Sequence, residues 1–582
     1  MESDAARPHD ESSPRTGRGT VRGPARRRRR RHLHGDEQEL VDRRQAPQLP
    51  VRDADRVGDQ ARQARPDAPR RDLHGHHARV LGEARRRRGT RRLAPQRTDE
   101  LREGPAGAER TRLPWSGAGP VPRRADRSQG LTRALEVGRA ALAATEGEAE
   151  VVAHAETSGL ARFASSEVHQ PTLIDNVVVT LRVVRDGRTG VASTNRVDED
   201  GLAELAQRAS EAAKSAPADP DFPGLAEPAA LPRVKGYDAP TAELGPEDQA
   251  RGAAEAIAAS DVPVYGFFTS GLSELAVVSS TGLEADQQMT DAMTLVVAAD
   301  NGCSGYAEAT SWRAGAIDPA AVAREASEKA AQTNGAKEIE PSTYAAVLEP
   351  YAFADLLQYF SYDSFGALGL LEERSYFAGR LGERVFDERI SIADDSLDPR
   401  GLPKAFDFEG SPKRRVELVV DGVARGVVWD RTTAKRAGNG ASTTGHAPPQ
   451  GLADEGPLPS ALSVAAGDAE STQELVERVG EGLYITRLHY LGVVQPREGV
   501  ITGMTRDGTF RIRDGKIAEP LVNLRFTVSV PELLQEVHGL TREVSLVNAS
   551  NFYGERYPYG ALVPALATAR FNITGVGSAP GI

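Results

Sequence analysis

The chain has 582 residues and a formal net charge of −11, but the charge is divided unevenly near residue 128. Residues 1–127 hold 32 Arg, no Lys and 19 acidic residues, a net charge of +13, whereas residues 128–582 carry −24. An acidic main body does not favour nucleic acid as the principal partner. No stretch approaches the ~20 consecutive apolar residues of a membrane-spanning helix. Cys303 is the only cysteine, which excludes an internal disulfide, so we expect a cytoplasmic protein with no membrane partner.

The first segment, residues 1–127, contains no Ile, Phe, Tyr, Asn or Lys, and Trp115 is its only aromatic residue. This composition cannot bury enough apolar surface to offset the entropy of ordering, so we expect a disordered Arg-rich tail. The Arg runs at 26–31 and 85–88 could contact phosphates, but no aromatic residues interleave with them to stack bases. The bias toward residues with GC-rich codons instead suggests that this segment is mis-translated, so its six histidines receive no metal assignment.

Helices and hairpins are expected in the main body. Helices are predicted at 201–215, 245–259 and 318–334, where apolar residues recur at helical spacing or Pro246, Asp318 and Gly335 mark the ends. Three Asp-Gly pairs predict two-residue turns. The strand pairs that they join are 176–184 with 190–194, 416–420 with 423–429, and 509–513 with 516–518.

The expected fold class is therefore α+β. Residues 128–340 are expected to form an α/β region with antiparallel strands and helices. Residues 341–582 are expected to form a mostly antiparallel β domain, because short strands joined by hairpin turns dominate there.

The residues alone indicate no active site. No phosphate-binding loop, G-x-S-x-G elbow, C-x-x-C pair, H-E-x-x-H or H-E-x-x-x-H occurs in the sequence. The acidic pairs Glu372-Glu373 and Asp394-Asp395 are interpreted as solvated loop charges as readily as functional groups. The histidines of the main body are too far apart to form a helical ligand pair, and each is interpreted as a surface or hydrogen-bonded residue: His154, His169, His446, His489 and His538.

Several motifs nevertheless follow one another in a recognisable order. They are G-x-A-S-T at 190–194 before an Ala-rich helix, SSTGLEADQQMTDAMTLVVAADNG at 279–302, GLPKAFDFEG at 401–410, STTGHA at 442–447, GLYI at 482–485 and VPALATARFNITG at 563–575. In this order they resemble the TldD/PmbA (TldE) family of metallopeptidase subunits, once described as modulators of DNA gyrase. The resemblance covers the chain from about Ser128 onward, and STTGHA is similar to the S-T-G-H-A signature of the PmbA/TldE branch.

The resemblance implies a cytoplasmic peptidase built from two related subunits. In the TldD-type subunit, a helix carries H-E-x-x-x-H and a distant cysteine completes a zinc site, where zinc activates a water and the glutamate takes its proton. Aligned with that family, residues 348–363 place the first ligand position on Gln358, the base position on Tyr359 and the second histidine position on Asp363. The cysteine position falls on Ile485.

All four family positions are therefore replaced, and of these only Asp363 could bind a metal. The resemblance thus implies a PmbA/TldE-type chain with no catalytic residue, metal ligand or cofactor of its own. Its implied partner is a TldD-type subunit that carries the zinc, and the implied substrate is an unfolded or extended peptide.

Three functions remain open at this point. The leading hypothesis is a non-catalytic subunit of a TldD/TldE-type metallopeptidase heterodimer that degrades or processes unfolded peptides. The second is an adaptor or modulator that acts without peptidase activity. The third is a peptidase with an unrecognised site, involving His446 or His489.

Overall fold

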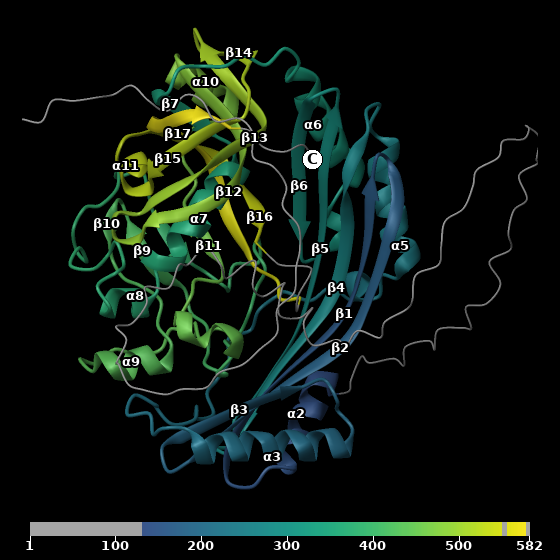
Figure 1. The fold of residues 1–582 in the computed structure, drawn as a ribbon, viewed down its shortest axis with the longest axis vertical. Helices are drawn as coiled ribbons and strands as arrows, with labels where there is room; N and C mark the ends of the chain where they lie inside the picture. Colours follow the sequence, from purple (N-terminus) through teal and green to yellow (C-terminus); the bar gives the residue numbers. More distant parts are fainter. Residues whose placement is uncertain (1–130, 550–555, 578–582) are drawn as a thin grey trace, which may run out of the picture. The chain divides into compact units, whose positions relative to one another are not determined.

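The computed structural model describes residues 131–549 and 556–577, so the tail predicted for residues 1–127 lies outside the described residues. The described chain forms a six-stranded sheet and an 11-stranded sheet, together with helices (Figure 1). The α+β class predicted from the sequence is confirmed. Within these residues, no helix combines the length and apolar character needed to cross a membrane.

The six-stranded sheet is antiparallel throughout, with the order β3-β2-β1-β4-β5-β6. Its strands are β1 (Glu148–Ala164), β2 (Glu167–Arg185), β3 (Arg188–Thr194), β4 (Val264–Ser279), β5 (Glu284–Asp300) and β6 (Cys303–Ser311). Its helices are α2 (Arg133–Ala143), α3 (Glu199–Ser215), α4 (Ala239–Ala242), α5 (Pro246–Ala258) and α6 (Pro319–Gln332). The buried faces of α2 and α3 pack on one half of the sheet, and those of α5 and α6 pack on the other half.

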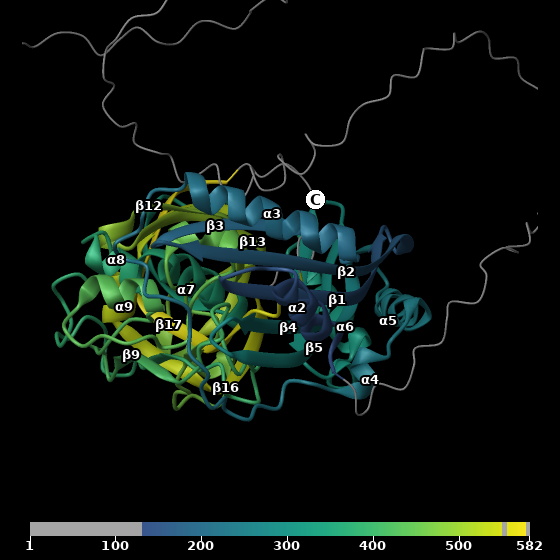
Figure 2. The ribbon, with the colours of Figure 1, turned by 90° about the horizontal axis from the view of Figure 1, so that it is seen from below.

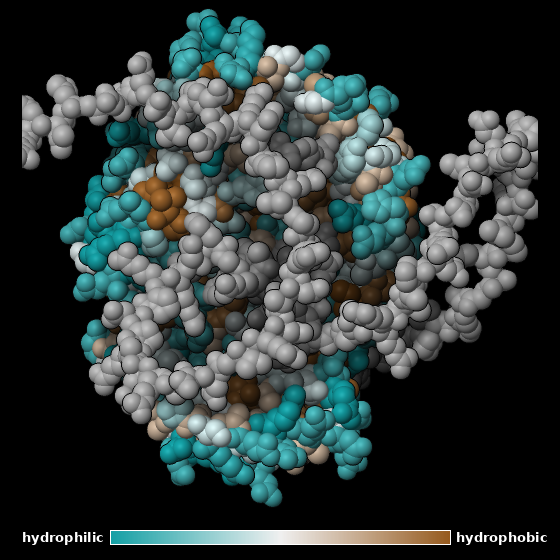
Figure 3. All heavy atoms as spheres, viewed as in Figure 1, coloured by the Kyte–Doolittle hydropathy of each residue, from teal (hydrophilic) through white to brown (hydrophobic). Residues whose placement is uncertain are grey.

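The predicted helices of this region are confirmed, and α6 has the expected cap, whereas the cap of α3 was not predicted. Asp198 and Asp318 accept backbone N–H groups at the starts of α3 and α6, so α3 begins two residues earlier than predicted. Asp248 bonds back to the N–H of Gly245 at the start of α5. The outer face of α3 is exposed and polar, as the hydrophilic surface at the bottom of Figure 3 shows, which leaves only its alanine-rich side for packing.

The six-stranded region contains an internal repeat that the sequence reasoning missed. A helix, three antiparallel strands and a second helix occur twice, as α2-β1-β2-β3-α3 and as α5-β4-β5-β6-α6. The two last hairpins share the pattern Asp/Asn-Gly-x-x-Gly, at 186–190 and 301–305, and the two last helices share Ala-x-x-Ala-Ser-Glu-x-Ala, at 206–213 and 323–330. The repeat places an alanine-rich helix over a strand glycine in each half. Figure 2 shows α3 lying along β3.

The glycine of the G-x-A-S-T motif has a steric reason. A Cβ on Gly190 would lie 2.1 Å from the backbone N of Ala213 and 2.2 Å from the carbonyl O of Ala209. Because backbone atoms of α3 cannot move aside like a flexible side chain, only glycine allows β3 and α3 to approach so closely.

We expect Gly190→Ala to lower the free energy of unfolding by about 1–3 kcal/mol, since the helix must shift away from the strand. Gly315→Ala is the matched control, because a Cβ there meets no atom within 4 Å. Urea unfolding followed by circular dichroism measures both. Equal stabilities of the two variants would contradict the close approach.

The second sheet contains a closed ring of strands. Its strands are β7 (Ser342–Leu348), β8 (Ile392–Asp394), β9 (Val416–Val420), β10 (Val423–Ala424), β11 (Leu462–Val464), β12 (Gly482–Gln495), β13 (Val500–Arg513), β14 (Lys516–Pro520), β15 (Leu524–Ser529), β16 (Val537–Asn548) and β17 (Gly560–Val576). The order β17-β15-β13-β12-β7 closes because β7 also pairs with β17. All pairs are antiparallel except β7 with β12 and β11 with β17. All five strands of the ring contribute residues to the largest apolar core of the described chain, together with α7.

The helices of this region are short apart from α7. They are α7 (Pro350–Ser364), α8 (Ala367–Leu371), α9 (Arg431–Ala437), α10 (Thr472–Val479) and α11 (Val530–Gln535). The Asp-Gly turns at 421–422 and 514–515 have positive φ at both residues, as predicted. The strand predicted over 423–429 was wrong in length: β10 ends at Ala424, and Val428 instead pairs with Gly366 in front of α8.

Candidate functional site

Helix α7 carries three of the four family positions, and strand β12 carries the fourth (Figure 1). α7 follows β7 directly and begins with Pro350, whose missing N–H is not needed in the first helical turn. The N–H of Glu349 donates to the carbonyl O of Ile485 at 3.0 Å, which ties the start of the helix to β12. One side of α7 packs into the main core through Ala352, Phe353, Leu356, Leu357 and Phe360.

The three family positions of α7 are engaged with neighbouring side chains. Gln358 Nε2 donates to Tyr362 Oη at 2.9 Å, and the rings of Tyr359 and Tyr362 meet edge to face, 6.0 Å between centroids. The carboxylate of Asp363 accepts from Arg374 Nη1 at 2.9 Å. Burial raises the pKa of Tyr359, so its phenol is a poor base near neutral pH. Burial also raises the pKa of Asp363, and the opposite charge of Arg374 offsets only part of this rise.

The fourth family position belongs to the core. Ile485 is 0% exposed and lies in register with Leu348 of β7 and Thr509 of β13. Zinc in proteins is held by imidazole, thiolate or carboxylate groups, usually three or four of them. The four positions offer one carboxylate, already paired with Arg374, together with an amide, a phenol and an aliphatic chain. These residues do not fit a zinc ion.

No other metal-binding group occurs in the described parts of the chain. Across residues 131–549 and 556–577, no three or more His, Cys, Asp or Glu side chains are grouped so that they could hold a metal ion.

Two half-buried carboxyl groups, one on α7 and one on the neighbouring β6, escaped the sequence reasoning. Asp355 lies one helical turn before Tyr359 and accepts from the N–H of Leu488 at 3.4 Å. Burial, reinforced by the charge of Glu308, raises the pKa of Asp355 to about 7. Glu308 of β6 accepts from Tyr306 Oη, and burial raises its pKa as well. Tertiary folding thus brings two protonatable acids next to the family positions.

A basic residue lies close to these two acids. Arg487, two residues after Ile485, donates from Nε and Nη2 to one carboxylate oxygen of Asp507, and its guanidinium lies 4.0 Å from the ring centroid of Tyr306. Burial lowers the pKa of Arg487, but Asp507 and the other acidic neighbours together outweigh burial, so the pKa is raised. The site is therefore an ionic contact between β6, α7 and β12.

The pH dependence of stability should reveal Asp355. Because its folded pKa of about 7 lies above the ordinary value of about 3.9, its protonated form stabilises the fold below pH ~4, and that contribution is lost as pH rises through 7. The free energy of unfolding of Asp355→Asn should therefore rise relative to that of the wild type between pH 4 and 7, by at most about 1.4 kcal/mol per pH unit. Urea unfolding across this range measures the difference, and parallel curves would contradict it.

The family's GLPKAFDFEG and STTGHA segments meet in a buried ionic cluster. Asp394 is 0% exposed, and it accepts from His446 Nε2 at 2.7 Å and from the N–H groups of Ser460 and Ala461 at 2.6 and 2.8 Å. Of the two interpretations left open for Asp394, the solvated loop charge is excluded, because the residue is fully buried and its partners lie more than 50 residues away in sequence. Burial acts to raise the pKa of Asp394, but His446 and Lys413 hold it well below its usual range.

Two lysines lie in the same interior. Lys413 Nζ donates to Ser460 Oγ at 2.8 Å, and burial lowers the pKa of Lys413. Lys404 is 0% exposed, donates to the carbonyl O of Leu402 at 3.0 Å and lies 5.2 Å from the ring centroid of Tyr559. Burial lowers the pKa of Lys404 to about 7. The charged residues inside these motifs were the one sequence signal for this cluster.

The histidines of the third hypothesis lie in different settings. His446 is 1% exposed, with Nδ1 at 2.9 Å from Thr444 Oγ1, and burial lowers its pKa. His489 is partly exposed, and its ring lies 4.2 Å from that of Tyr490. Burial, together with Arg506, lowers the pKa of His489 to about 4. His446 is thus held as an internal hydrogen-bonding residue.

Comparison with known proteins agrees with this architecture. The PmbA/TldA metallopeptidase C-terminal domain matches residues 341–575, and the PmbA/TldA metallopeptidase domain 1 matches residues 149–213. The Metalloprotease TldD homolog of Haemophilus influenzae is 26% identical over 210 residues, which are 35% of this chain and 42% of that protein. The chain spans less than two thirds of the length of the curated relatives that it matches.

Solved structures show the same fold. TldE from Thermococcus kodakarensis superimposes with a TM-score of 0.67 at 20% identity, covering 76% of this chain and 99% of that one. A protein of Thermotoga maritima described as a modulator of a DNA gyrase gives a TM-score of 0.64 at 19% identity, with 73% and 96% covered.

Fold and motifs together place the chain among the proteins built on PmbA/TldA metallopeptidase domains. The chain belongs to the TldD/PmbA family, as its motifs implied.

Proposed function

We propose that this chain is the PmbA/TldE-type, non-catalytic subunit of a TldD/TldE-type zinc metallopeptidase complex that degrades or processes unfolded peptides in the cytoplasm. Its partner is a TldD-type subunit, which supplies the zinc and the catalytic glutamate. The observation that carries the proposal is the loss of the family's metal-binding side chains at Gln358, Asp363 and Ile485, and of its base at Tyr359.

The contacts at these positions support this proposal. A metal ligand needs a free lone pair directed at the ion, yet Asp363 is neutralised by Arg374 and Ile485 fills the core. Gln358 donates to Tyr362 rather than standing free. The positions have therefore been recruited into packing and hydrogen bonding, which is expected of a subunit whose contribution is shape rather than chemistry.

In the complex, this subunit would help to enclose a chamber in which the substrate is held. An extended peptide can be held by backbone hydrogen bonds with little dependence on its sequence. Such binding fits unfolded substrates, because their backbone groups are free to pair. The subunit would thus add affinity and enclosure, while its partner performs the hydrolysis.

Reconstitution tests the proposal. The chain is co-expressed with a TldD-type subunit that carries H-E-x-x-x-H, and the two are expected to co-elute and to cleave an unfolded peptide until a zinc chelator is added. In the matched control, the glutamate of the partner's motif is changed to Gln, which should abolish cleavage without preventing assembly. Failure of the two chains to associate would contradict the proposed partnership.

A further inference from the structure

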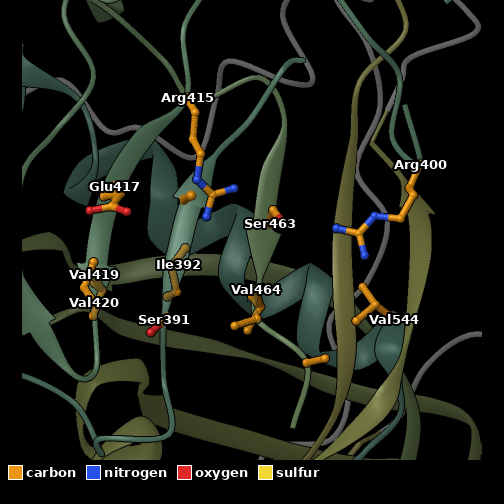
Figure 4. Close-up of a pocket in the computed structure, with 13 residues that line it drawn as sticks. Ser391, Ile392, Arg400, Arg415, Glu417, Val419, Val420, Ser463, Val464 and Val544 are labelled. Carbon is orange, nitrogen blue, oxygen red and sulfur yellow. The ribbon is translucent and has the colours of Figure 1, made fainter. Parts of the chain in front are cut away.

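A hollow of about 300 Å³ lies on one face of the β9-β8-β11 part of the second sheet (Figure 4). None of its lining residues belongs to α7 or β12, so it is separate from the family positions. It exists because the neighbouring strands carry small side chains on this face: Ala393 of β8 lies in register with Ser463 of β11, and Ala465 follows. Its volume falls at the lower end of the range for small-molecule sites.

The walls of the hollow combine apolar and charged groups. Ala393, Val420, Ala465 and Val544 supply apolar surface. Ile392, Val419 and Val464 also border the hollow, but their side chains belong to the main core. Arg415 and Arg400 enter from its two sides with Ser463 between them, and Glu417 lies beside Arg415 (Figure 4). A ligand here would meet an apolar floor and two guanidinium groups.

Each arginine is oriented by an aspartate that is itself nearly buried. Arg400 donates from Nε and Nη2 to Asp398, at 3.1 and 2.6 Å, and Arg415 donates from Nη1 to Asp395 at 2.8 Å. The side chains of Asp398 and Asp395 are only 10% and 14% exposed. Nη1 of Arg400 and Nε and Nη2 of Arg415 have no acceptor within hydrogen-bond distance among the described residues. These donors are left for a ligand.

We propose that this hollow binds a small carboxylate that carries an apolar side chain. Guanidinium groups with free, pre-oriented N–H donors pair well with carboxylate oxygens. The apolar walls would take up the aliphatic body of the ligand. Glu417 and the two aspartates disfavour a multiply charged anion, so a monoanion is bound in preference to a phosphate. The inference does not depend on the proposed function, since the site lies apart from α7.

Binding is tested with the full chain at low ionic strength by isothermal titration calorimetry. The probes are N-acetyl-leucine, the peptide acetyl-Ala-Ala-Ala-Leu with a free carboxyl end, and the same peptide amidated. Saturable binding of a carboxylate probe at one site per chain is expected, with the amide at least about tenfold weaker. Binding of the peptide acid alone identifies a peptide terminus as the ligand, whereas equal binding of N-acetyl-leucine identifies a free small carboxylate.

Matched variants locate the binding. Arg400→Gln and Arg415→Gln should each weaken binding at least about tenfold, and Ser463→Leu should abolish it by filling the hollow. Arg196→Gln is the control: Arg196 pairs with Asp198, two residues on, and its side chain is 56% exposed, but it lies outside the hollow. Circular dichroism confirms that each variant is folded. Equal binding of acid and amide, tighter binding of inorganic phosphate, unchanged binding in both arginine variants, or no binding by any probe would overturn the proposal.

Discussion

Replacing Arg556 by Met is expected to lower the free energy of unfolding by about 3–5 kcal/mol. The Arg556 side chain is 2% exposed, and its Nε and Nη2 donate to the two carboxylate oxygens of Asp291 at 2.8 and 2.7 Å. Nη1 donates to Thr269 Oγ1 at 2.9 Å. The substitution leaves the fully buried Asp291 carboxylate without its partner, which is the costly event. Chemical unfolding at neutral pH measures the loss.

Two further variants distinguish the effect of breaking the buried ion pair from the effect of losing any arginine. Arg139→Met removes a two-pronged pair with Glu284 whose side chains are 42% and 48% exposed, so stability should change little. The double variant Arg556→Met with Asp291→Leu should recover much of the loss, because no buried charge remains. If Arg556→Met were no more destabilising than Arg139→Met, the buried pair would not hold β4 and β5 to the segment that begins at Arg556.

Replacing Asp394 by Ala is the second change with a large expected effect. Asp394 accepts three hydrogen bonds, from His446 and from the N–H groups of Ser460 and Ala461. Its loss leaves these buried donors without an acceptor and removes the charge facing Lys413. We expect a loss of at least about 3 kcal/mol in the free energy of unfolding, measured by urea titration.

The adjacent acid provides the control, and pH provides a second test. Asp395→Ala removes a pair with Arg415, whose side chain is 53% exposed, and should lower the free energy of unfolding clearly less than Asp394→Ala does. Because the folded pKa of Asp394 lies below its ordinary value of about 3.9, its contribution is complete above pH ~4 and is lost only in stronger acid. Asp394 itself should thus contribute no pH dependence between pH 8 and 5, and any change over that range in the gap between wild type and Asp394→Ala comes from His446 and Lys404, whose pKa values the charge of Asp394 raises. Equal losses in the two alanine variants would contradict the cluster.

Elements with local signals were predictable from sequence. Pro246, the cap at Asp318 and the Asp-Gly turns act through nearest neighbours, so α5, α6 and the hairpins appeared without tertiary information. The long strand β4 was not predicted, because both of its faces are buried and the polar alternation is absent. Val278 packs under α2 and α3, whereas Val277 packs against Phe406 on the opposite face.

The site was predictable only in part, for a related reason. The family positions on α7 came from resemblance along a continuous segment. Asp355 and Glu308 are 47 residues apart in the chain and approach only when β6 meets α7, so no local pattern joins them. The burial of Asp394 could not be predicted for the same reason, since its partner His446 lies 52 residues later in the chain. The internal repeat, by contrast, was readable in the sequence and was missed.

The most direct test of the central claim is the zinc content of the isolated full-length chain after dialysis, measured by plasma mass spectrometry beside a peptide-cleavage assay. Gln358, Asp363 and Ile485 in place of metal ligands predict no stoichiometric zinc and no cleavage of unfolded peptides by the chain alone. Cleavage should appear with the TldD-type partner and stop with a chelator. One tightly held zinc per chain, or cleavage by the chain alone that a chelator does not stop, would contradict the non-catalytic role.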